Sequence, residues 1–360
     1  MTAGGLRVGV IGVGWAGQQH LAGFARLPGV ELHAIAGMEA ERVAELATKY
    51  GIRNRFERWE DMLDAGGLDA VNVAVPTYLH APIAIAALER GLHVLTEKPV
   101  AANLGDAQAM VAAARAAGRM LQVVFNYRER GDIAELRRIM TAGELGTPYA
   151  AKAGWLRRKG IPGDGTWFTN RERAGGGPLI DLGVHVLDYA LELLGEPEVL
   201  TVSATAYAEL GSRGRGGSSA DAIGAAFEVE DLAMAFMRLA GGGTLTLETS
   251  WAAYRPDNDE MWLTIYGTDG GADLRVIDYA DPGELNVYRD AEENSADYHV
   301  DPSAANGGHS AVIRRFADAV AAGPGEWAKH DGSIGLSRAR IIDACYRSAA
   351  SGREVALAGR

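Results

Sequence analysis

Cysteine is almost absent from this chain. Cys345 is the only cysteine among 360 residues, so an intrachain disulfide framework is excluded. No Cys-x-x-Cys pair is available for a structural zinc site either. This composition fits a reducing compartment.

Long apolar runs and an excess of positive charge are also lacking. Arg, Glu or Gly interrupts the Ala-rich segments, and no stretch approaches the roughly 20 apolar residues of a membrane helix. Residues 1–7 contain no apolar core of signal-peptide length, so we expect a cytoplasmic protein. The formal net charge of −12 disfavours nucleic acid and anionic membranes as partners.

The first third of the chain alternates short β-branched runs with longer amphipathic stretches. This alternation is typical of parallel strands joined by crossover helices, a doubly wound α/β unit. The expected strands are residues 7–11, 31–36, 69–75, 92–95 and 120–124, and the expected helices are residues 16–27, 40–50, 78–90 and 103–117.

After about residue 126 the pattern changes to strands without intervening helices, which pair antiparallel. The expected strands are residues 201–209, 222–229, 232–239, 243–251 and 261–266, and the expected helices are 179–194, 310–322 and 333–350. Residues 212–219 are expected to form a Gly- and Ser-rich loop, and residues 278–301 a long acidic loop.

A glycine motif follows the first expected strand directly. In Gly12-Val-Gly14-Trp15-Ala16-Gly17, the first Gly permits a tight turn, the second lets backbone approach a pyrophosphate, and the third lets helix pack on strand. A Gly-rich turn without a ligand is the alternative, but the surrounding α/β pattern favours dinucleotide binding.

These patterns predict an α/β Rossmann domain followed by an α+β domain with a large, mostly antiparallel open sheet. We expect residues 1–125 to bind the dinucleotide and residues 126–330 to bind substrate and form an oligomer. Residues 331–360 are expected to pack back on the first domain.

The position of the adenosine ribose is less regular. About 20 residues past Gly17, where an acidic side chain would bind the 2′-hydroxyl, the sequence reads Gly37-Met38-Glu39. Glu39 and Glu41 would repel a 2′-phosphate, although Arg42 could reach one. NAD is therefore favoured, with NADP as the alternative.

Thr96-Glu97-Lys98-Pro99 follows the expected strand 92–95, at the carboxyl edge of the sheet where open α/β folds bind ligands. A surface lysine before proline is the simpler interpretation. A buried strand directly before it would instead direct the Lys98 ammonium toward the cofactor.

The Glu97-Lys98-Pro99 unit resembles the mark of the glucose-fructose oxidoreductase/inositol dehydrogenase (Gfo/Idh/MocA) family. The family's second motif, Asp-x-x-x-His after a Gly-rich segment, resembles residues 175–185, which include Asp181 and His185. The C-terminal segment around Asp331 is also similar. The resemblance covers essentially the whole chain and implies that Lys98, Asp181 and His185 are catalytic.

The helical spacing agrees with this resemblance. Asp181, His185 and Asp188 fall at i, i+4 and i+7 and share one face of a largely apolar helix. A buried Asp or His needs a hydrogen-bond partner or a function, which favours a catalytic role. The alternative is structural: Asp181 would cap a helix, and His185 would be a core histidine with its hydrogen bonds satisfied.

Further cofactor contacts are predicted at other strand ends. Pro76 and Thr77 resemble the family segment beside the cofactor, His80 either faces the cleft or starts a helix, and Asn126 and Trp167 could border the nicotinamide. The full predicted cofactor set is Gly12, Gly14, Trp15, Ala16, Gly17, Gly37, Met38, Pro76, Thr77, His80, Glu97, Lys98, Asn126 and Trp167. No metal site is predicted, because the eight histidines form no His-x-His or His-x-x-x-His pair.

The predicted reaction is hydride transfer between nicotinamide and a ring secondary alcohol of a sugar, amino sugar, glycoside or cyclitol. His185 would transfer the proton and Lys98 would stabilise the alkoxide, but the resemblance leaves open which of the two moves the proton. A redox-neutral NAD-dependent glycosidase and a non-catalytic cofactor sensor are the alternatives. A homodimer or homotetramer through the second-domain sheet is expected, while substrate identity and direction of reaction are not encoded in the motifs.

Overall fold

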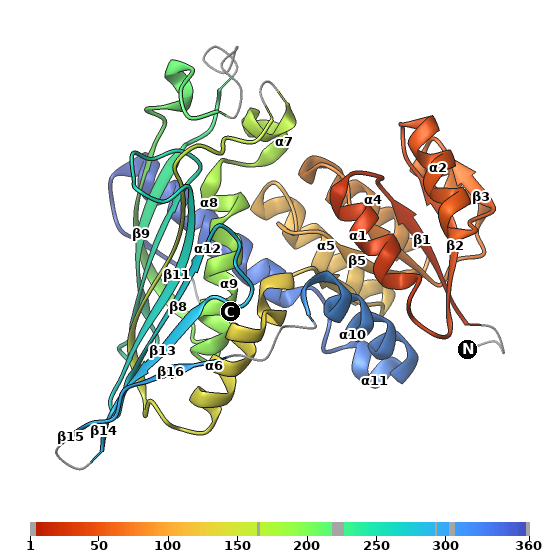
Figure 1. The fold of residues 1–360 in the computed structure, drawn as a ribbon. Helices are drawn as coiled ribbons and strands as arrows, with labels where there is room; N and C mark the ends of the chain where they lie inside the picture. Colours follow the sequence, from red (N-terminus) through yellow and green to blue (C-terminus); the bar gives the residue numbers. More distant parts are fainter. Residues whose placement is uncertain (1–4, 164–165, 218–226, 292–293, 302–306, 358–360) are drawn as a thin grey trace. The chain divides into compact units, whose positions relative to one another are not determined.

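The computed structural model of the chain describes residues 5–163, 166–217, 227–291, 294–301 and 307–357. It contains two compact units (Figure 1). The first unit comprises Met1–Asn126 and Gly307–Ala339, and the second comprises Tyr127–Asn306 and Arg340–Arg360. Within the described ranges, no helix has the length and apolar character needed to cross a membrane.

The first unit is built on a parallel sheet with strand order β3-β2-β1-β4-β5-β6. Strands β4 and β5 are buried along their whole length and β1 is buried over its last four residues, as expected for strands covered on both faces. The strands are β1 (Leu6–Ile11), β2 (Val30–Ala36), β3 (Asn54–Phe56), β4 (Ala70–Val73), β5 (His93–Thr96) and β6 (Leu121–Val123). This is the order of a Rossmann fold and confirms the predicted fold class.

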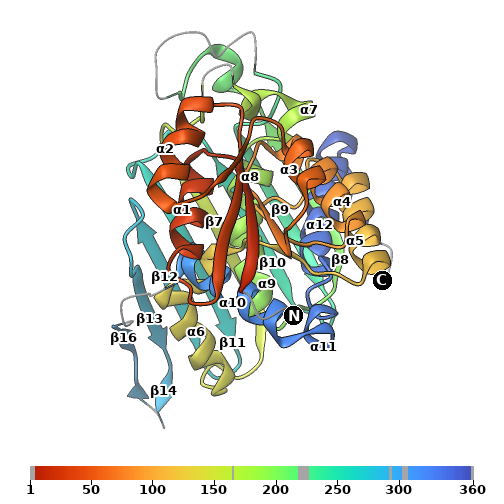
Figure 2. The same ribbon diagram turned by 90° about the vertical axis from the view of Figure 1, so that its right-hand side faces the viewer.

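Helices lie on both faces of this sheet (Figure 2). They are α1 (Trp15–Phe24), α2 (Ala40–Tyr50), α3 (Trp59–Ala65), α4 (His80–Glu89), α5 (Leu104–Ala117), α10 (Gly308–Ala322) and α11 (Pro324–Trp327), with the short η1 (Thr77–Leu79). Helix α10 packs directly on α1, because a Cβ at Gly23 would lie only 2.5 Å from Ile313 Cδ1. Leu21, Phe24 and Phe316 complete this contact within one core.

The packing of α10 corrects the predicted domain limits. Residues 307–330 were expected in the second domain, but they belong to the first unit through α10 and α11. Residues 340–360 were expected to pack on the first domain, but they belong to the second unit. Strand β17 (Val355–Ala356) pairs there with β8 (Val199–Tyr207) and adds an edge to the second sheet.

The second unit is built on a sheet with order β16-β13-β12-β11-β7-β10-β9-β8-β17. Only the pairing of β7 with β10 is parallel among its described pairs, so the sheet is mostly antiparallel. Its remaining strands are β7 (Pro148–Arg157), β9 (Leu232–Leu239), β10 (Thr244–Ser250), β11 (Asp259–Gly267), β12 (Gly271–Ile277), β13 (Glu284–Tyr288) and β16 (Tyr298–Val300). The small hairpin β14 (Asp290–Ala291) and β15 (Asn294–Ser295) follows β13.

Helices of the second unit cover one face of its sheet, as Figure 1 shows for α6, α8 and α9. Thr249 on β10 lies on this covered face, since its Cγ2 would contact a Cβ at Gly183 of α9. The helices are α6 (Gly131–Thr141), α7 (Arg171–Ala174), α8 (Pro178–Asp181), α9 (Gly183–Leu193) and α12 (Ser333–Ser351), with η2 (Asn126–Glu129), η3 (Trp167–Thr169) and η4 (Gly211–Arg213). The boundary between the two units falls within α12.

Several predicted elements of the second unit differ from the structure. The predicted helix 179–194 is two helices, with Leu182 between α8 and α9. The predicted acidic loop 278–301 contains the strands β13, β14, β15 and β16. These strands were not predicted, because they are short and contain too few alternating apolar residues. Of the predicted strand 222–229, residues 222–226 lie outside the described residues and 227–229 form no strand.

Candidate active site

The glycine motif forms the turn between β1 and α1. Gly12 has φ +102°, and a Cβ there would lie 2.0 Å from the Ala74 carbonyl oxygen, so only glycine fits. A Cβ at Gly17 would lie 2.1 Å from the Gly12 oxygen, so this glycine allows the helix to approach the strand turn. At Gly14 a Cβ would meet nothing within 4 Å, which leaves open space beside the backbone.

The start of α1 provides the electrostatics that this open space requires. Gly14 caps the helix with no side-chain hydrogen bond, and no acidic residue occupies the first turn. The free amides and the helix dipole therefore favour an anion at this position. The turn fits the pyrophosphate of a dinucleotide, with Trp15, Ala16 and Gly17 supplying the first-turn amides.

The predicted ribose site lies at the end of β2. Met38 is 82% exposed, and Glu39 and Glu41 are exposed beside it. Arg42 is held by Gln18 Oε1 at 2.9 Å and by Glu45 at 2.5 Å. Its guanidinium is thus already engaged, which disfavours a role in binding a 2′-phosphate.

His80 connects two turns at the carboxyl edge of the first sheet. Its ring nitrogens lie 2.9 Å from the Pro99 and the Val75 carbonyl oxygens, and the side chain is buried. Burial lowers the pKa of His80, although the two carbonyl contacts oppose that shift. His80 therefore joins the segment before Pro76 and Thr77 to the segment that carries Lys98.

Glu97 is buried beside Lys98, where sequence reasoning placed it near the cofactor. Its Oε1 lies 2.8 Å from His20 Nε2 and 3.5 Å from His309 Nε2, and its Oε2 accepts the Lys98 backbone N–H at 3.1 Å. Burial alone would raise the pKa of Glu97, but the two imidazoles lower it well below its usual range. His20 and His309 could not be assigned to this site from the sequence, because they come from segments far apart in the chain.

Asp181 and His185 lie in the second unit, on α8 and α9. The Trp251 indole N–H donates to Asp181 Oδ2 at 3.0 Å, and Trp251 is completely buried. The His185 ring packs against Tyr127 with ring centroids 4.6 Å apart, and against Trp155 at 5.9 Å. These aromatic contacts fix the orientation of the imidazole.

Next to these aromatic rings, Arg157 at the end of β7 and Asp259 at the start of β11 form an ion pair. Asp259 accepts from the Trp155 indole and from Arg157 Nε, both at 2.8 Å, and Arg157 also bonds to the Tyr279 hydroxyl. Burial would lower the pKa of Arg157, but Tyr279, Asp181 and Asp259 together raise it. Tyr279 itself has φ +61°, a strained conformation of the kind found at functional sites.

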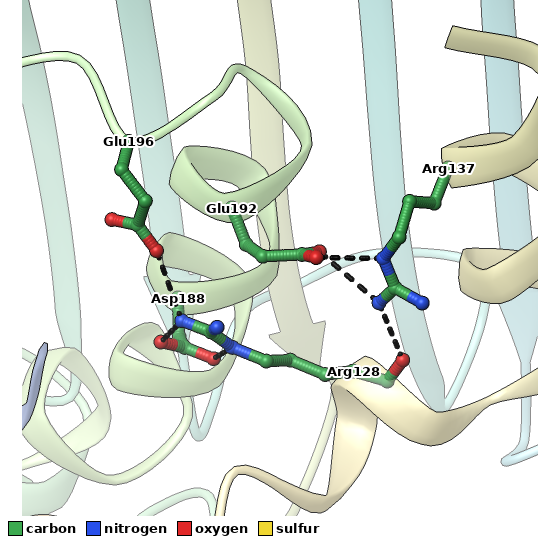
Figure 3. Close-up of polar contacts among 5 residues, drawn as sticks. All are labelled: Arg128, Arg137, Asp188, Glu192 and Glu196. Carbon is green, nitrogen blue, oxygen red and sulfur yellow. Dashed lines mark hydrogen bonds and ion pairs between the residues drawn. The ribbon is translucent and has the colours of Figure 1, made fainter. Parts of the chain in front are cut away.

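Arg128 and Asp188 form a buried pair in the second unit (Figure 3). Arg128 Nε and one terminal nitrogen lie 2.5 and 2.6 Å from the two Asp188 oxygens. The same terminal nitrogen lies 3.2 Å from Glu196 Oε1. Arg137 then joins Glu192 to the Arg128 carbonyl. Asp188 therefore holds η2 against α9, while Glu192 holds α6 there through Arg137. This pairing accounts for Asp188, the third polar residue at helical spacing with Asp181 and His185.

The remaining predicted residues divide between the two units. Asn126 ends the first unit, whereas Trp167 lies in the second and stacks on Phe168 with centroids 3.9 Å apart. Lys98 belongs to the first unit, and Asp181 and His185 belong to the second. Their action on one substrate remains a prediction.

The chain matches known protein families over most of its length. Residues 6–125 match the model of the GFO/IDH/MocA oxidoreductase family with its NAD-binding Rossmann fold, and residues 133–273 match the family's C-terminal domain. The chain belongs to this family. Its first unit is accordingly an NAD-binding Rossmann domain, and the resemblance inferred from Glu97-Lys98-Pro99 is confirmed.

Among its curated relatives is the D-glucoside 3-dehydrogenase of Escherichia coli (strain K12), 37% identical over 275 residues. The alignment covers 76% of this chain and 78% of the relative. The levoglucosan dehydrogenase of Pseudarthrobacter phenanthrenivorans is 30% identical over 301 residues, covering 78% and 76% of the two chains. The similarity is thus to named sugar dehydrogenases.

Solved structures of the family match over both units. Levoglucosan dehydrogenase in complex with NADH and L-sorbose has a TM-score of 0.84 and 26% identity, and 99% of each chain is covered. GenD2 from gentamicin A biosynthesis in complex with NAD has a TM-score of 0.79 and 25% identity, with 100% of this chain and 98% of that chain covered.

Proposed function

We propose that this oxidoreductase transfers a hydride between NAD and a ring secondary hydroxyl of a neutral glucoside or a related sugar. The observation that carries the proposal is the surroundings of Asp181 and His185: Asp181 accepts from the Trp251 indole, and His185 lies against Tyr127 and Trp155 beside the Arg157–Asp259 ion pair. The dinucleotide turn before α1 and the position of Lys98 after β5 support it from the first unit.

The proposed mechanism assigns one role to each side chain. Nicotinamide, when bound, supplies the hydride acceptor. His185 takes the hydroxyl proton as an imidazole suited to transfer near neutral pH. Lys98 stabilises the negative charge that develops on the oxygen, and Asp181 holds a substrate hydroxyl or orients the imidazole.

The relatives and the charges together favour a neutral sugar ring. The relatives named above are a D-glucoside 3-dehydrogenase and a levoglucosan dehydrogenase, and a myo-inositol 2-dehydrogenase of Thermotoga maritima is 27% identical over 191 residues. Basic side chains before α8 could bind an anionic substrate only if they were not already engaged. Arg157 is paired with Asp259, and Arg171 lies over the Tyr346 ring.

A panel of substrates tests the proposal. NADH formation should be measured with methyl glucosides, 1,6-anhydro sugars, inositols, amino sugars and uronates at equal concentration. We expect activity on neutral rings and loss of turnover in Lys98→Met with NAD affinity retained. Activity confined to acyclic alcohols would contradict the proposal, as would a Lys98→Met variant with unchanged turnover.

We also propose that the uncovered face of the second sheet forms a homo-oligomer interface. The apolar residues Ala233, Ala235, Met237, Leu245 and Leu247 are buried, and they alternate in register with Thr249, on the helix-covered face. The uncovered face carries Met234 and Phe236 of β9 and Trp262 of β11, and Met234 is 44% exposed. Sedimentation should show an oligomer that Phe236→Asp weakens, and a monomeric parent protein would contradict this.

A further inference from the structure

Three segments of the first unit bring titratable side chains together at Glu97. His20 comes from the middle of α1, Glu97 from the turn after β5, and His309 from the first turn of α10. One atom from each lies within 4.8 Å of the other two. His20 is completely buried, and the Glu97 and His309 side chains are 11% and 14% exposed.

The contacts of His20 hold its ring between Asn72 and Glu97. Its Nδ1 lies 2.8 Å from Asn72 Oδ1, an oxygen that can only accept, and its Nε2 lies 2.8 Å from the Glu97 carboxylate. The Asn72 amide nitrogen faces the Leu95 carbonyl at 3.4 Å, which supports this orientation. Both ring nitrogens of His20 therefore lie 2.8 Å from a side-chain oxygen, one of Asn72 and one of Glu97.

The second oxygen of Glu97 connects the group to Lys98. Glu97 Oε2 accepts the Lys98 backbone N–H at 3.1 Å, so the carboxylate that pairs with the two imidazoles also holds the Lys98 peptide. His309 adds a contact with the dinucleotide turn, because its ring meets the Trp15 ring edge-on at 5.4 Å.

We propose that His20, Glu97 and His309 form a positioning cluster that fixes the Lys98 peptide and connects it to the dinucleotide turn. Glu97 acts through its bond to the Lys98 amide, and the two histidines hold the carboxylate in place. The three side chains act through the Lys98 peptide, so they are positioning residues. The catalytic part of this inference rests on the role of Lys98 in the proposed function.

A divalent metal held by the same three side chains is the competing interpretation. Two histidines and one carboxylate are a frequent ligand set, and a carbonyl oxygen behind a ligating histidine is common in such sites. The 2.8 Å separation between His20 Nε2 and Glu97 Oε1 is instead the distance of a direct contact between the two side chains. Elemental analysis of the purified enzyme distinguishes the two, and stoichiometric zinc or iron that Glu97→Gln removes would overturn the proposal.

A double-mutant cycle tests whether Glu97 acts through Lys98. Glu97→Gln should lower kcat about tenfold or more, since small displacements of a catalytic group are costly, while the Kd for NAD stays within about twofold. In the Lys98→Met background, Glu97→Gln should have no further effect on kcat. Equal effects with and without Lys98 would overturn the proposal.

Glu31→Gln provides the matched control. Glu31 lies 2.8 Å from His33 in the same unit, but this pair is on the exposed part of β2. We expect its kcat to equal that of the parent enzyme, because exposed ion pairs contribute little. An equal loss in Glu31→Gln and Glu97→Gln would assign the effect to general charge removal and overturn the proposal.

Hydrogen exchange at the Lys98 amide gives a result that does not depend on catalysis. His309→Phe keeps a ring against Trp15 but removes the nitrogen that faces Glu97. In both His309→Phe and Glu97→Gln the Lys98 amide should exchange about tenfold faster than in the parent, as measured by mass spectrometry on short peptides. If Lys98→Met retains full turnover, the proposed function fails and this measurement alone decides the inference. Unchanged protection of the Lys98 amide would overturn it.

Discussion

The Trp251 indole N–H donates a hydrogen bond to the Asp181 carboxylate at 3.0 Å, and the indole itself is completely buried. Trp251 follows β10, which pairs with β7 and β9, so the central part of the second sheet fixes the position of this donor. Asp181 is thus oriented by a rigid element, as a residue that binds a substrate hydroxyl must be.

Replacing the Trp251 indole donor should reduce activity by more than the accompanying loss of folding stability can explain. Trp251→Phe keeps an aromatic ring but removes the N–H, and a hydrogen bond to a charged group contributes about 1.5–3 kcal/mol. We therefore expect kcat/KM to fall about tenfold or more. Steady-state kinetics and urea unfolding on the same preparation separate this effect from the loss of ring volume. Unchanged kcat/KM would show that Asp181 needs no orienting donor.

His185 should control the pH dependence of oxidation. If its neutral imidazole accepts the hydroxyl proton, kcat/KM for oxidation should rise with pH as imidazoles lose their proton, between about pH 6 and 8. His185→Ala should lower turnover by roughly 10² to 10⁴ and flatten this rise. A His185→Ala enzyme with the parent pH profile would assign the proton transfer to another group.

The Arg128–Asp188 pair should be a major contributor to the stability of the second unit. Asp188 is 1% exposed, so Asp188→Asn would leave a buried guanidinium without its main counter-charge at a cost of about 3–5 kcal/mol. Glu209→Gln, which breaks an exposed pair with Arg213 in the same unit, should cost less than about 1 kcal/mol. Urea unfolding measures both variants, and equal midpoints would contradict the assignment.

NAD should bind more tightly than NADP. Glu39 and Glu41 are exposed beside the end of β2, where a 2′-phosphate would lie, and Arg42 is engaged by Gln18 and Glu45. Titration of the apoprotein with both cofactors measures the preference, and Glu39→Gln should narrow it. Tighter binding of NADP would mean that Arg42 exchanges its partners for the phosphate.

The sequence predicted the first unit well because its signals are local. The glycine motif, the apolar runs of β1, β4 and β5, and Glu97-Lys98-Pro99 each lie within a few consecutive residues. Strand β3 was missed, since Asn54, Arg55 and Phe56 form no apolar run. The place of α10 was also missed, because its contact with α1 joins residues nearly 300 positions apart.

The second unit shows what spacing alone leaves undetermined. A spacing of four residues indicated that Asp181 and His185 belong together, but the break at Leu182 between α8 and α9 was not predicted. Asp188 shared the helical pattern, although its role depends on Arg128, which comes from a different segment. The cluster at Glu97 also combines distant segments, and a search for paired histidines in sequence could not find it.

In the proposed reaction, a hydride moves from a ring carbon of a neutral glucoside to NAD. The most direct measurement uses methyl glucoside deuterated at ring C3, the position named for the Escherichia coli relative. We expect deuterium in the NADH that accumulates, together with a ring-keto product. Glycoside cleavage without net NADH would contradict the claim, as would NADH that carries no deuterium from any ring position of a fully ring-deuterated glucoside.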